Sequence, residues 1–211
     1  MIRALSVVML AFVFAAPVAS QAPEGIMMRV NRSSNPQDPD DMPEVTITTV
    51  GEGFQVSTGP AVMLWREDQR ASGNYTLSGR FTLLDPSTHR NYYGLVFGGR
   101  NLTSENQWYL YFMVAQTGEF VVINRIDNAN TNYLVSHTEH SEIQRPDANG
   151  RSVNDLAVRI NGDQIEFVVN GTVVHATERS GSLLDTNGLY GAQIDHVLPG
   201  VLVENLSVTG M

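Results

Sequence analysis

Three apolar runs follow one another between Asn91 and Arg125, and they constrain the fold more than any other stretch of the chain. Each run is rich in aromatic and β-branched residues, and short polar or glycine-containing segments separate them. This pattern is typical of three consecutive antiparallel strands. The middle run is apolar on both of its alternating faces, with Trp108, Leu110, Phe112 and Val114 on one and Tyr109, Tyr111 and Met113 on the other. We therefore expect a central strand with one face on the core and the tyrosine side lining a binding cleft.

The remaining strands are predicted from alternation and turn residues. They fall at 44–50, 54–57, 62–65, 75–84, 156–160, 164–169, 172–175, 188–194 and 201–208, with one helical turn over 180–185. Two Asn-Gly pairs, at 161–162 and 170–171, predict tight hairpin turns and a meander with fixed register. Residues 126–151 are polar and predict a surface loop. The sequence thus predicts an all-β fold, a two-sheet antiparallel β-sandwich spanning residues 44–211.

The first 43 residues are expected to lie outside this domain. Residues 1–22 resemble a signal peptide, because Arg3 precedes a 13-residue apolar core that ends before Pro17 and small residues follow. That core is too short to span a bilayer. Residues 23–43 hold a cluster of proline and acidic residues and predict an extended lead-in.

Composition narrows the class of protein further. Without Arg3 the chain has 12 Arg, no Lys and 22 acidic residues, a formal charge of 12 − 22 = −10, which argues against nucleic acid as a partner. No later stretch is long enough for membrane insertion. The absence of Cys excludes disulfides, thiol nucleophiles and a lipid-anchor cysteine. An exported chain of this size without disulfides suits a bacterial periplasm or the cell exterior.

The closing half of the chain resembles a known fold family. The stretch from Asn154 through Gly162 to Asn170-Gly171, with its strand residues between, resembles concanavalin A-like lectin/glucanase jelly rolls. Residues 188–208, with Gly73-Asn-Tyr75 and Tyr93-Gly94-Leu95 earlier, are similar to strands of the 3-keto-disaccharide hydrolase (DUF1080-type) branch. The resemblance implies a jelly roll that binds or cleaves carbohydrate. The chain lacks the Glu-x-Asp-x-x-Glu strand that jelly-roll glucanases carry.

Candidate site residues follow from what a sugar needs, namely flat aromatic rings for stacking and polar groups for hydrogen bonds. The predicted ligand-binding residues are Tyr92, Tyr109, Tyr111, Trp65, Arg125 and Gln193. The predicted general acid and base are His196 and Asp195, which follow a matched strand. No metal site and no cofactor are predicted; a structural calcium ion is compatible with the fold, but no residue pattern indicates one.

The sequence leaves three functions open, two that act on carbohydrate and one that does not. The aromatic cleft strand favours an exported glycan-binding domain without catalysis. The resemblance of residues 188–208 favours a glycoside hydrolase similar to the 3-keto-disaccharide hydrolases. A structural or interaction role in the cell envelope is the third alternative, in which the aromatic residues bury a protein partner.

Overall fold

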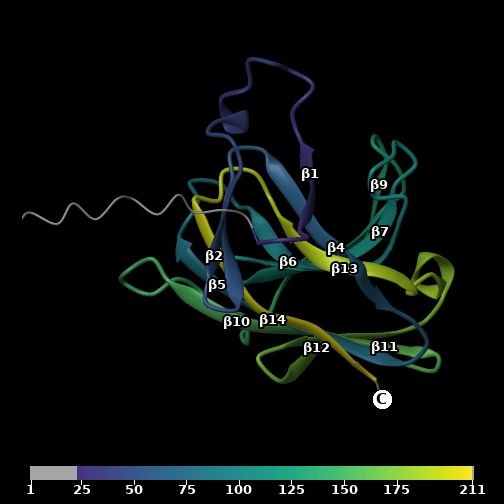
Figure 1. Ribbon diagram of the computed structural model, residues 1–211. Helices are drawn as coiled ribbons and strands as arrows, with labels where there is room; N and C mark the ends of the chain where they lie inside the picture. Colours follow the sequence, from purple (N-terminus) through teal and green to yellow (C-terminus); the bar gives the residue numbers. More distant parts are fainter. Residues whose placement is uncertain (1–22, 211) are drawn as a thin grey trace, which may run out of the picture.

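A computed structural model describes residues 23–210 as two antiparallel sheets packed face to face. The predicted signal peptide, residues 1–22, lies outside the described residues. In spatial order, sheet A contains β1 (Met27–Asn31), β4 (Ala61–Ala71), β13 (Gly188–Ile194), β6 (Tyr92–Arg100), β7 (Trp108–Ala115), β8 (Glu119–Arg125) and β9 (Thr131–Glu139) (Figure 1). Sheet B contains β12 (Thr172–Glu178), β11 (Gln164–Val169), β10 (Ser152–Asn161), β5 (Tyr75–Asp85), β14 (Gly200–Gly210), β3 (Gly53–Ser57) and β2 (Thr46–Val50). The predicted all-β two-sheet sandwich is confirmed.

The main core lies between the two sheets and is built by alternation. On β5 every second residue from Tyr75 to Leu83 is buried, while the residues between them are less so. β10 shows the same two-residue period, with Leu156 and Val158 in the core. Because successive side chains of a strand point to opposite faces, this pattern places one face of sheet B on sheet A and the other in solvent.

The meander of β10, β11 and β12 forms as predicted. Asn170 and Gly171 have φ angles of 51° and 86°, the left-handed conformation that a tight two-residue hairpin requires. The Asn170 side chain also reaches back to the neighbouring strand, where its Oδ1 accepts a hydrogen bond from the Asp155 amide at 2.8 Å. The predicted helical turn is the 3₁₀ helix η2 (Gly181–Leu184).

Two segments differ from the sequence-based expectation. Residues 126–151 were expected to form an irregular loop, but residues 131–139 form β9, which pairs with β8 at the edge of sheet A. Most of β9 is exposed, so its polar composition masks the strand pattern. Within the expected lead-in, residues 27–31 form β1 and pair with β4, and Pro39–Asp41 form the 3₁₀ helix η1.

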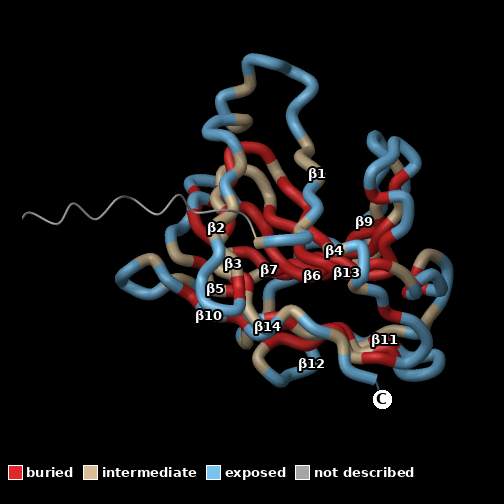
Figure 2. Tube along the Cα trace, in the orientation of Figure 1, coloured by how far each residue is buried: buried red, intermediate tan, exposed pale blue. Residues whose placement is uncertain are grey.

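Within residues 23–210, no helix has the length and apolar character needed to cross a bilayer. Sheet A differs from sheet B in being buried on both of its faces along β6, β7 and β8 (Figure 2). The face of sheet A that points away from sheet B is therefore also buried along these strands, and it carries most of the predicted site residues.

Candidate functional site

A second apolar cluster covers the face of sheet A that points away from the main core. We call it the tyrosine face. It consists of Met63, Trp65, Tyr92, Val96, Leu102, Tyr109, Tyr111, Met113, Ala115, Val121, Ile123 and Leu189. Strand register places these residues in rows across the sheet: Tyr111 lies opposite Val96 on β6 and opposite Ile123 on β8. The three tyrosines predicted to bind ligand thus share one face: Tyr109 and Tyr111 through the alternation of β7, and Tyr92 from the neighbouring strand β6.

Polar groups from two strands lie on the same face. Gln193 of β13 pairs in register with Met63, and it is only 5% exposed. Its Oε1 atom accepts no hydrogen bond from any residue that the structure describes. Arg125 ends β8 opposite Tyr109, and its Nη2 donates to the Asn128 carbonyl at 2.7 Å. The buried Nε atom of Arg125 donates no hydrogen bond to any residue that the structure describes. Buried polar atoms without a partner are uncommon and are favourable points for a polar ligand.

Asp195 provides the negative charge of this face. Its Oδ2 accepts a hydrogen bond from the Tyr92 amide at 3.1 Å. Burial raises the pKa of the Asp195 carboxyl to about 6, and the hydrogen bond from Tyr92 opposes part of that rise. Burial also raises the pKa of the Tyr92, Tyr109 and Tyr111 hydroxyl groups, and the nearby Asp195 charge raises it further. The carboxyl is therefore close enough to all three tyrosines to interact with them electrostatically.

A second carboxylate lies near Tyr92. Burial raises the pKa of Tyr92 to about 12, and the charges of Glu119 and Asp195 both add to that rise. Glu119 is held by the Thr117 hydroxyl at 2.7 Å and by Arg90 at 3.4 Å. Glu119 and Asp195 thus both act electrostatically on the Tyr92 hydroxyl, and paired carboxyl groups are the residue types that glycosidic chemistry uses.

The floor of the tyrosine face is covered in this structure. Tyr109 and Tyr111 are 2% and 8% exposed. Arg29 of β1 reaches the loops after β6 and β8, where its guanidinium donates to the carbonyls of Leu102 at 3.0 Å and Ser104 at 2.8 Å and to the Asn128 side chain. The expected open cleft over these tyrosines is therefore not observed, and Arg29 connects β1 to two loops of sheet A.

An aromatic path leads from the covered floor to the surface. The Tyr92 hydroxyl is 2.7 Å from Nδ1 of His137, and the His137 ring lies 5.4 Å from the ring of Tyr133. Tyr133 is 50% exposed and pairs with Ile123 of the tyrosine face. Sequence reasoning missed Tyr133 and His137 because it placed them in a loop. The run Tyr133-Leu134-Val135 was the available signal for a strand.

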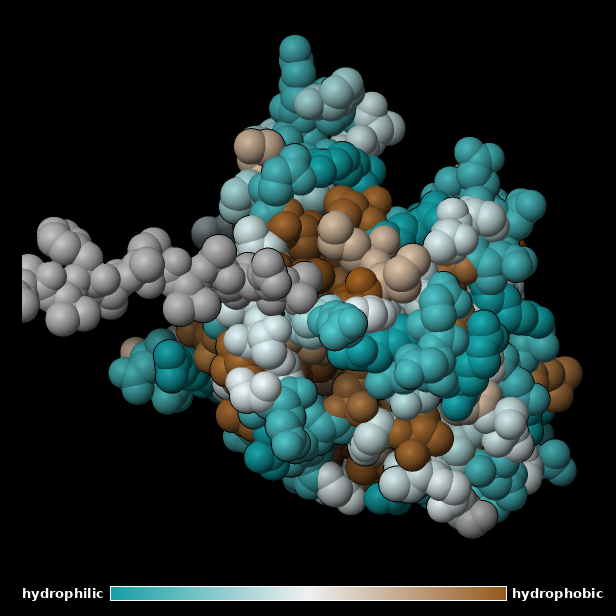
Figure 3. Space-filling view, in the orientation of Figure 1, coloured by the Kyte–Doolittle hydropathy of each residue, from teal (hydrophilic) through white to brown (hydrophobic). Residues whose placement is uncertain are grey.

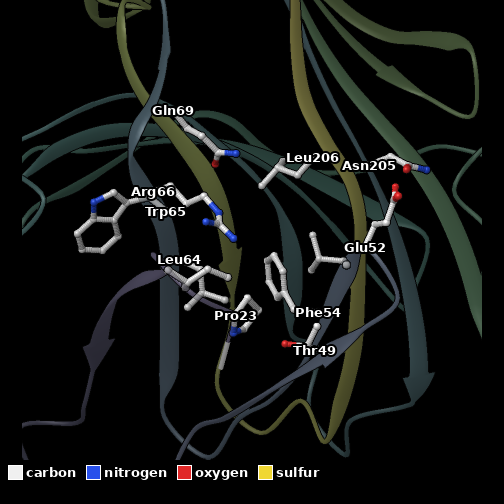
Figure 4. A pocket seen from close by; sticks show the side chains of 13 residues that line it. Pro23, Thr49, Glu52, Phe54, Leu64, Trp65, Arg66, Gln69, Asn205 and Leu206 are labelled. Atoms are coloured by element: carbon white, nitrogen blue, oxygen red, sulfur yellow. The ribbon is translucent and has the colours of Figure 1, made fainter. Parts of the chain in front are cut away.

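Trp65 belongs to the tyrosine face, but it also borders a separate hollow at an open edge between the sheets. This cavity of about 240 Å³ is lined by Pro23, Ile26, Thr49, Glu52, Gly53, Phe54, Leu64, Trp65, Arg66, Gln69, Val203, Asn205 and Leu206. Figure 4 shows the Arg66 side chain extending toward Phe54 and Leu206, whereas the Trp65 ring points away from them. Apolar residues also gather on the surface over β1 and β4, where Met27 and Met28 are exposed (Figure 3).

The structure separates the predicted acid and base. The Asp195 carboxyl points to the Tyr92 amide, whereas the His196 ring lies beside His89 and Asp40, with the two imidazole centroids 5.7 Å apart. Of the predicted residues, the tyrosine face thus brings together Tyr92, Tyr109, Tyr111, Trp65, Arg125, Gln193 and Asp195, but not His196.

No protein-family profile matches the chain, and no curated protein matches its sequence. Among solved structures, the carbohydrate-binding module CBM66 from Bacillus subtilis is 14% identical with a TM-score of 0.59, over 79% of this chain and 92% of the module. A GH16 protein of the Bacteroides ovatus mixed linkage glucan PUL, in complex with a G4G4G3G product, is 5% identical with a TM-score of 0.57, over 92% and 97%. These likenesses show that the chain has a two-sheet jelly-roll fold.

Proposed function

We propose that this chain is an exported bacterial protein that binds glycans through the tyrosine face of sheet A. The observation that carries the proposal is the convergence of three tyrosines with Gln193, Asp195 and Arg125 on one face of a jelly-roll sheet. Aromatic rings stack on the apolar faces of sugars, and amide, guanidinium and carboxylate groups bind the hydroxyls between them. The fold that this chain shares with a carbohydrate-binding module supports the same class of ligand.

The proposed entry point is the exposed end of the aromatic path. Tyr133 is open to solvent and His137 connects it to Tyr92, so a sugar ring stacked on Tyr133 meets the tyrosine face at its edge. Deeper contact with Gln193, whose amide oxygen lacks a partner within residues 23–210, requires the Arg29 bridge to move.

Isothermal titration against a panel of oligosaccharides tests the proposal. We expect saturable binding to at least one glycan and a loss of about 0.5 to 1.5 kcal/mol of binding free energy in Tyr133→Ala, the range for one aromatic contact. Val173→Ala, an exposed apolar residue on β12 of sheet B, is the matched control and should bind as well as wild type. The proposal is contradicted if no oligosaccharide of the panel binds, or if Tyr133→Ala binds as well as the control.

Glycoside cleavage is a second candidate, favoured by the two carboxyl groups at Tyr92. A carboxyl with a pKa of about 6, such as that of Asp195, stays partly protonated near neutral pH and can protonate a leaving-group oxygen. Glu119 would be its partner as base or nucleophile. Incubation with 3-keto-disaccharides and with β-glucans tests this function. Product that disappears in both Asp195→Asn and Glu119→Gln supports it, and absence of product with wild type excludes cleavage of these substrates.

Export is tested by expressing the chain in a bacterial host and sequencing the N-terminus of the secreted or periplasmic protein. We expect the mature protein to begin at or next to residue 23, after the small residues Ser20-Gln21-Ala22. Retention of Arg3 in an uncleaved cytoplasmic product contradicts export.

A further inference from the structure

Three potential metal ligands converge from segments that are far apart in the sequence. Asp40 lies in η1, His89 lies in the connection between β5 and β6, and His196 follows β13. One ligand atom from each of these side chains lies within 4.8 Å of the other two. The cluster joins the loop between β1 and β2 to connections from both sheets.

The distances in this cluster fit a shared ion better than hydrogen bonds. Asp40 Oδ2 is 3.8 Å from His89 Nδ1 and 3.9 Å from His196 Nε2. A hydrogen bond between nitrogen and oxygen spans about 2.7 to 3.2 Å, so neither contact is one. Two ligands on a tetrahedral zinc ion, each about 2.0 to 2.2 Å from it, lie about 3.3 to 3.6 Å apart. Each histidine thus lies within a few tenths of an ångström of the separation from Asp40 that a shared ion requires, and all three ligand atoms lie within 4.8 Å of one another.

The backbone around the cluster is firmly held. Asn91, which is buried, connects the two histidine segments: its amide N–H donates to the His89 carbonyl at 3.1 Å, and its side-chain amide donates to the His196 carbonyl. The Asp40 amide donates to the Asp38 side chain at 3.0 Å, which fixes the first turn of η1. Ligands on anchored backbone lose little conformational freedom when they bind a metal.

We propose that Asp40, His89 and His196 bind a divalent transition-metal ion, for which Zn²⁺ is the best match. Two imidazoles and one carboxylate suit zinc and its neighbours, whereas Ca²⁺ and Mg²⁺ prefer oxygen ligands alone. Three protein ligands leave a fourth position for water or for a ligand. His89 is exposed and a cavity of about 260 Å³ borders Asp40 and His196, so the ion has a path from solvent. The bound ion fastens the loop between β1 and β2 to the ends of both sheets.

The test uses the full chain without a polyhistidine tag, stripped of metal with a chelator and titrated with Zn²⁺ alone. We expect one Zn²⁺ per chain by calorimetry and a higher unfolding temperature in its presence, because an ion that binds only the folded state stabilises it. Co²⁺ should replace Zn²⁺ and give the strong visible absorption of a four-coordinate site. No saturable Zn²⁺ binding by the wild-type chain overturns the proposal.

Single variants identify the ligands. Asp40→Asn, His89→Ala and His196→Ala should each weaken Zn²⁺ binding by more than about tenfold, the loss that even an outer-shell change causes. His140→Ala is the matched control, because His140 lies outside the cluster in the connection that follows β9, and it should bind Zn²⁺ like wild type. His89→Ala is the least disruptive variant, since its side chain is exposed, and circular dichroism verifies its fold. Wild-type affinity in His89→Ala and His196→Ala overturns the assignment.

Discussion

At the scale of single residues, Asp195 is an acidic group whose environment disfavours its own charge. Burial raises the pKa of its carboxyl from 3.8 to about 6. Below the unfolded-state value the carboxyl is protonated in both states and costs the fold nothing. As pH rises through about 4 to 6 the unfolded chain ionises first, so the folded state loses relative stability. The conflict between burial and charge at Asp195 is what a binding or catalytic role would explain.

Asp195→Asn should therefore stabilise the protein at high pH and not at low pH. The amide oxygen still accepts the Tyr92 N–H, and the penalty for the buried charge is removed. We expect a gain of about 1 to 3 kcal/mol in the free energy of unfolding at about pH 8 and close to none at about pH 4. The pKa shift alone corresponds to the upper end of this range, and solvent screening at the partly exposed Asp195 lowers the gain. Urea unfolding at both pH values, in chelator, measures this gain. The exposed Asp163→Asn is the control, and an equal effect of Asp195→Asn at both pH values would contradict the assignment.

Asn154 is a second residue whose effect the structure predicts. It is fully buried, and its Oδ1 accepts from the Gln144 amide at 2.9 Å and from the Asn170 side chain at 3.1 Å. Its Nδ2 donates to the Gln144 carbonyl at 3.2 Å and to the Tyr93 hydroxyl at 3.4 Å. Asn154→Ala leaves these partners unsatisfied in the interior and should cost about 2 to 4 kcal/mol in denaturant unfolding. Asn132→Ala is the control, because Asn132 is exposed on β9, and it should change stability by less than about 0.5 kcal/mol. An equally small loss of stability in Asn154→Ala would contradict the role of Asn154.

At the scale of elements, we expect β1 to control access to the tyrosine face. Arg29 holds the loops at residues 101–107 and 126–130 through two carbonyls and one side chain. Arg29→Ala should release these loops, because no other hydrogen bond from β1 side chains to them exists in the described part of the chain. We expect faster amide hydrogen exchange in both loops and a faster association with glycan.

Arg32→Ala is the matched control for Arg29→Ala. Arg32 lies three residues further along and forms an exposed ion pair with Glu44, so its loss should leave exchange in the two loops unchanged. Unchanged exchange in Arg29→Ala, or an equal increase in both variants, would show that Arg29 does not close the tyrosine face.

Comparison of the individual strands with the sequence shows which elements local patterns can predict. The strands with strong alternation or Asn-Gly turns, such as β5 and the meander of β10 to β12, were predicted within a few residues because local chemistry determines them. The edge strand β9 was missed because its exposed polar residues look like a loop. The edge strand β1 was missed because it is only five residues long and lies in the segment that holds the proline and acidic cluster. The shared face of Tyr109 and Tyr111 followed from the alternation of β7, and the place of Tyr92 beside them followed from the predicted pairing of neighbouring strands. The bridge from Arg29 to the Leu102 carbonyl spans 73 residues and has no local signal in the sequence.

At the scale of the whole molecule, chain order and spatial order differ strongly, and this produces sites that no local pattern contains. β13 lies between β4 and β6 in sheet A, and β14 lies between β5 and β3 in sheet B. His196 in the connection between them therefore meets His89 and Asp40, which come from the first half of the chain. The cluster was invisible to motif analysis because its three members are single residues separated by 49 and 107 positions (89 − 40 and 196 − 89).

This topology also predicts how truncation acts. Because β14 is hydrogen-bonded to β5 on one side and β3 on the other, a chain that ends at residue 199 divides sheet B into two unconnected parts and exposes Leu83 and Val56 opposite the missing Val201. We expect this variant not to fold, with a far-UV spectrum of an unfolded chain and no cooperative thermal transition, since the buried side chains of β14 and the ladder bonds of two neighbours are lost together. A chain that ends at Thr209 keeps nearly all pairs of β14 and should melt within a few degrees of the full chain. A cooperative transition in the shorter chain would mean that β2 and β3 do not depend on β14 and that sheet B is not a single folding unit.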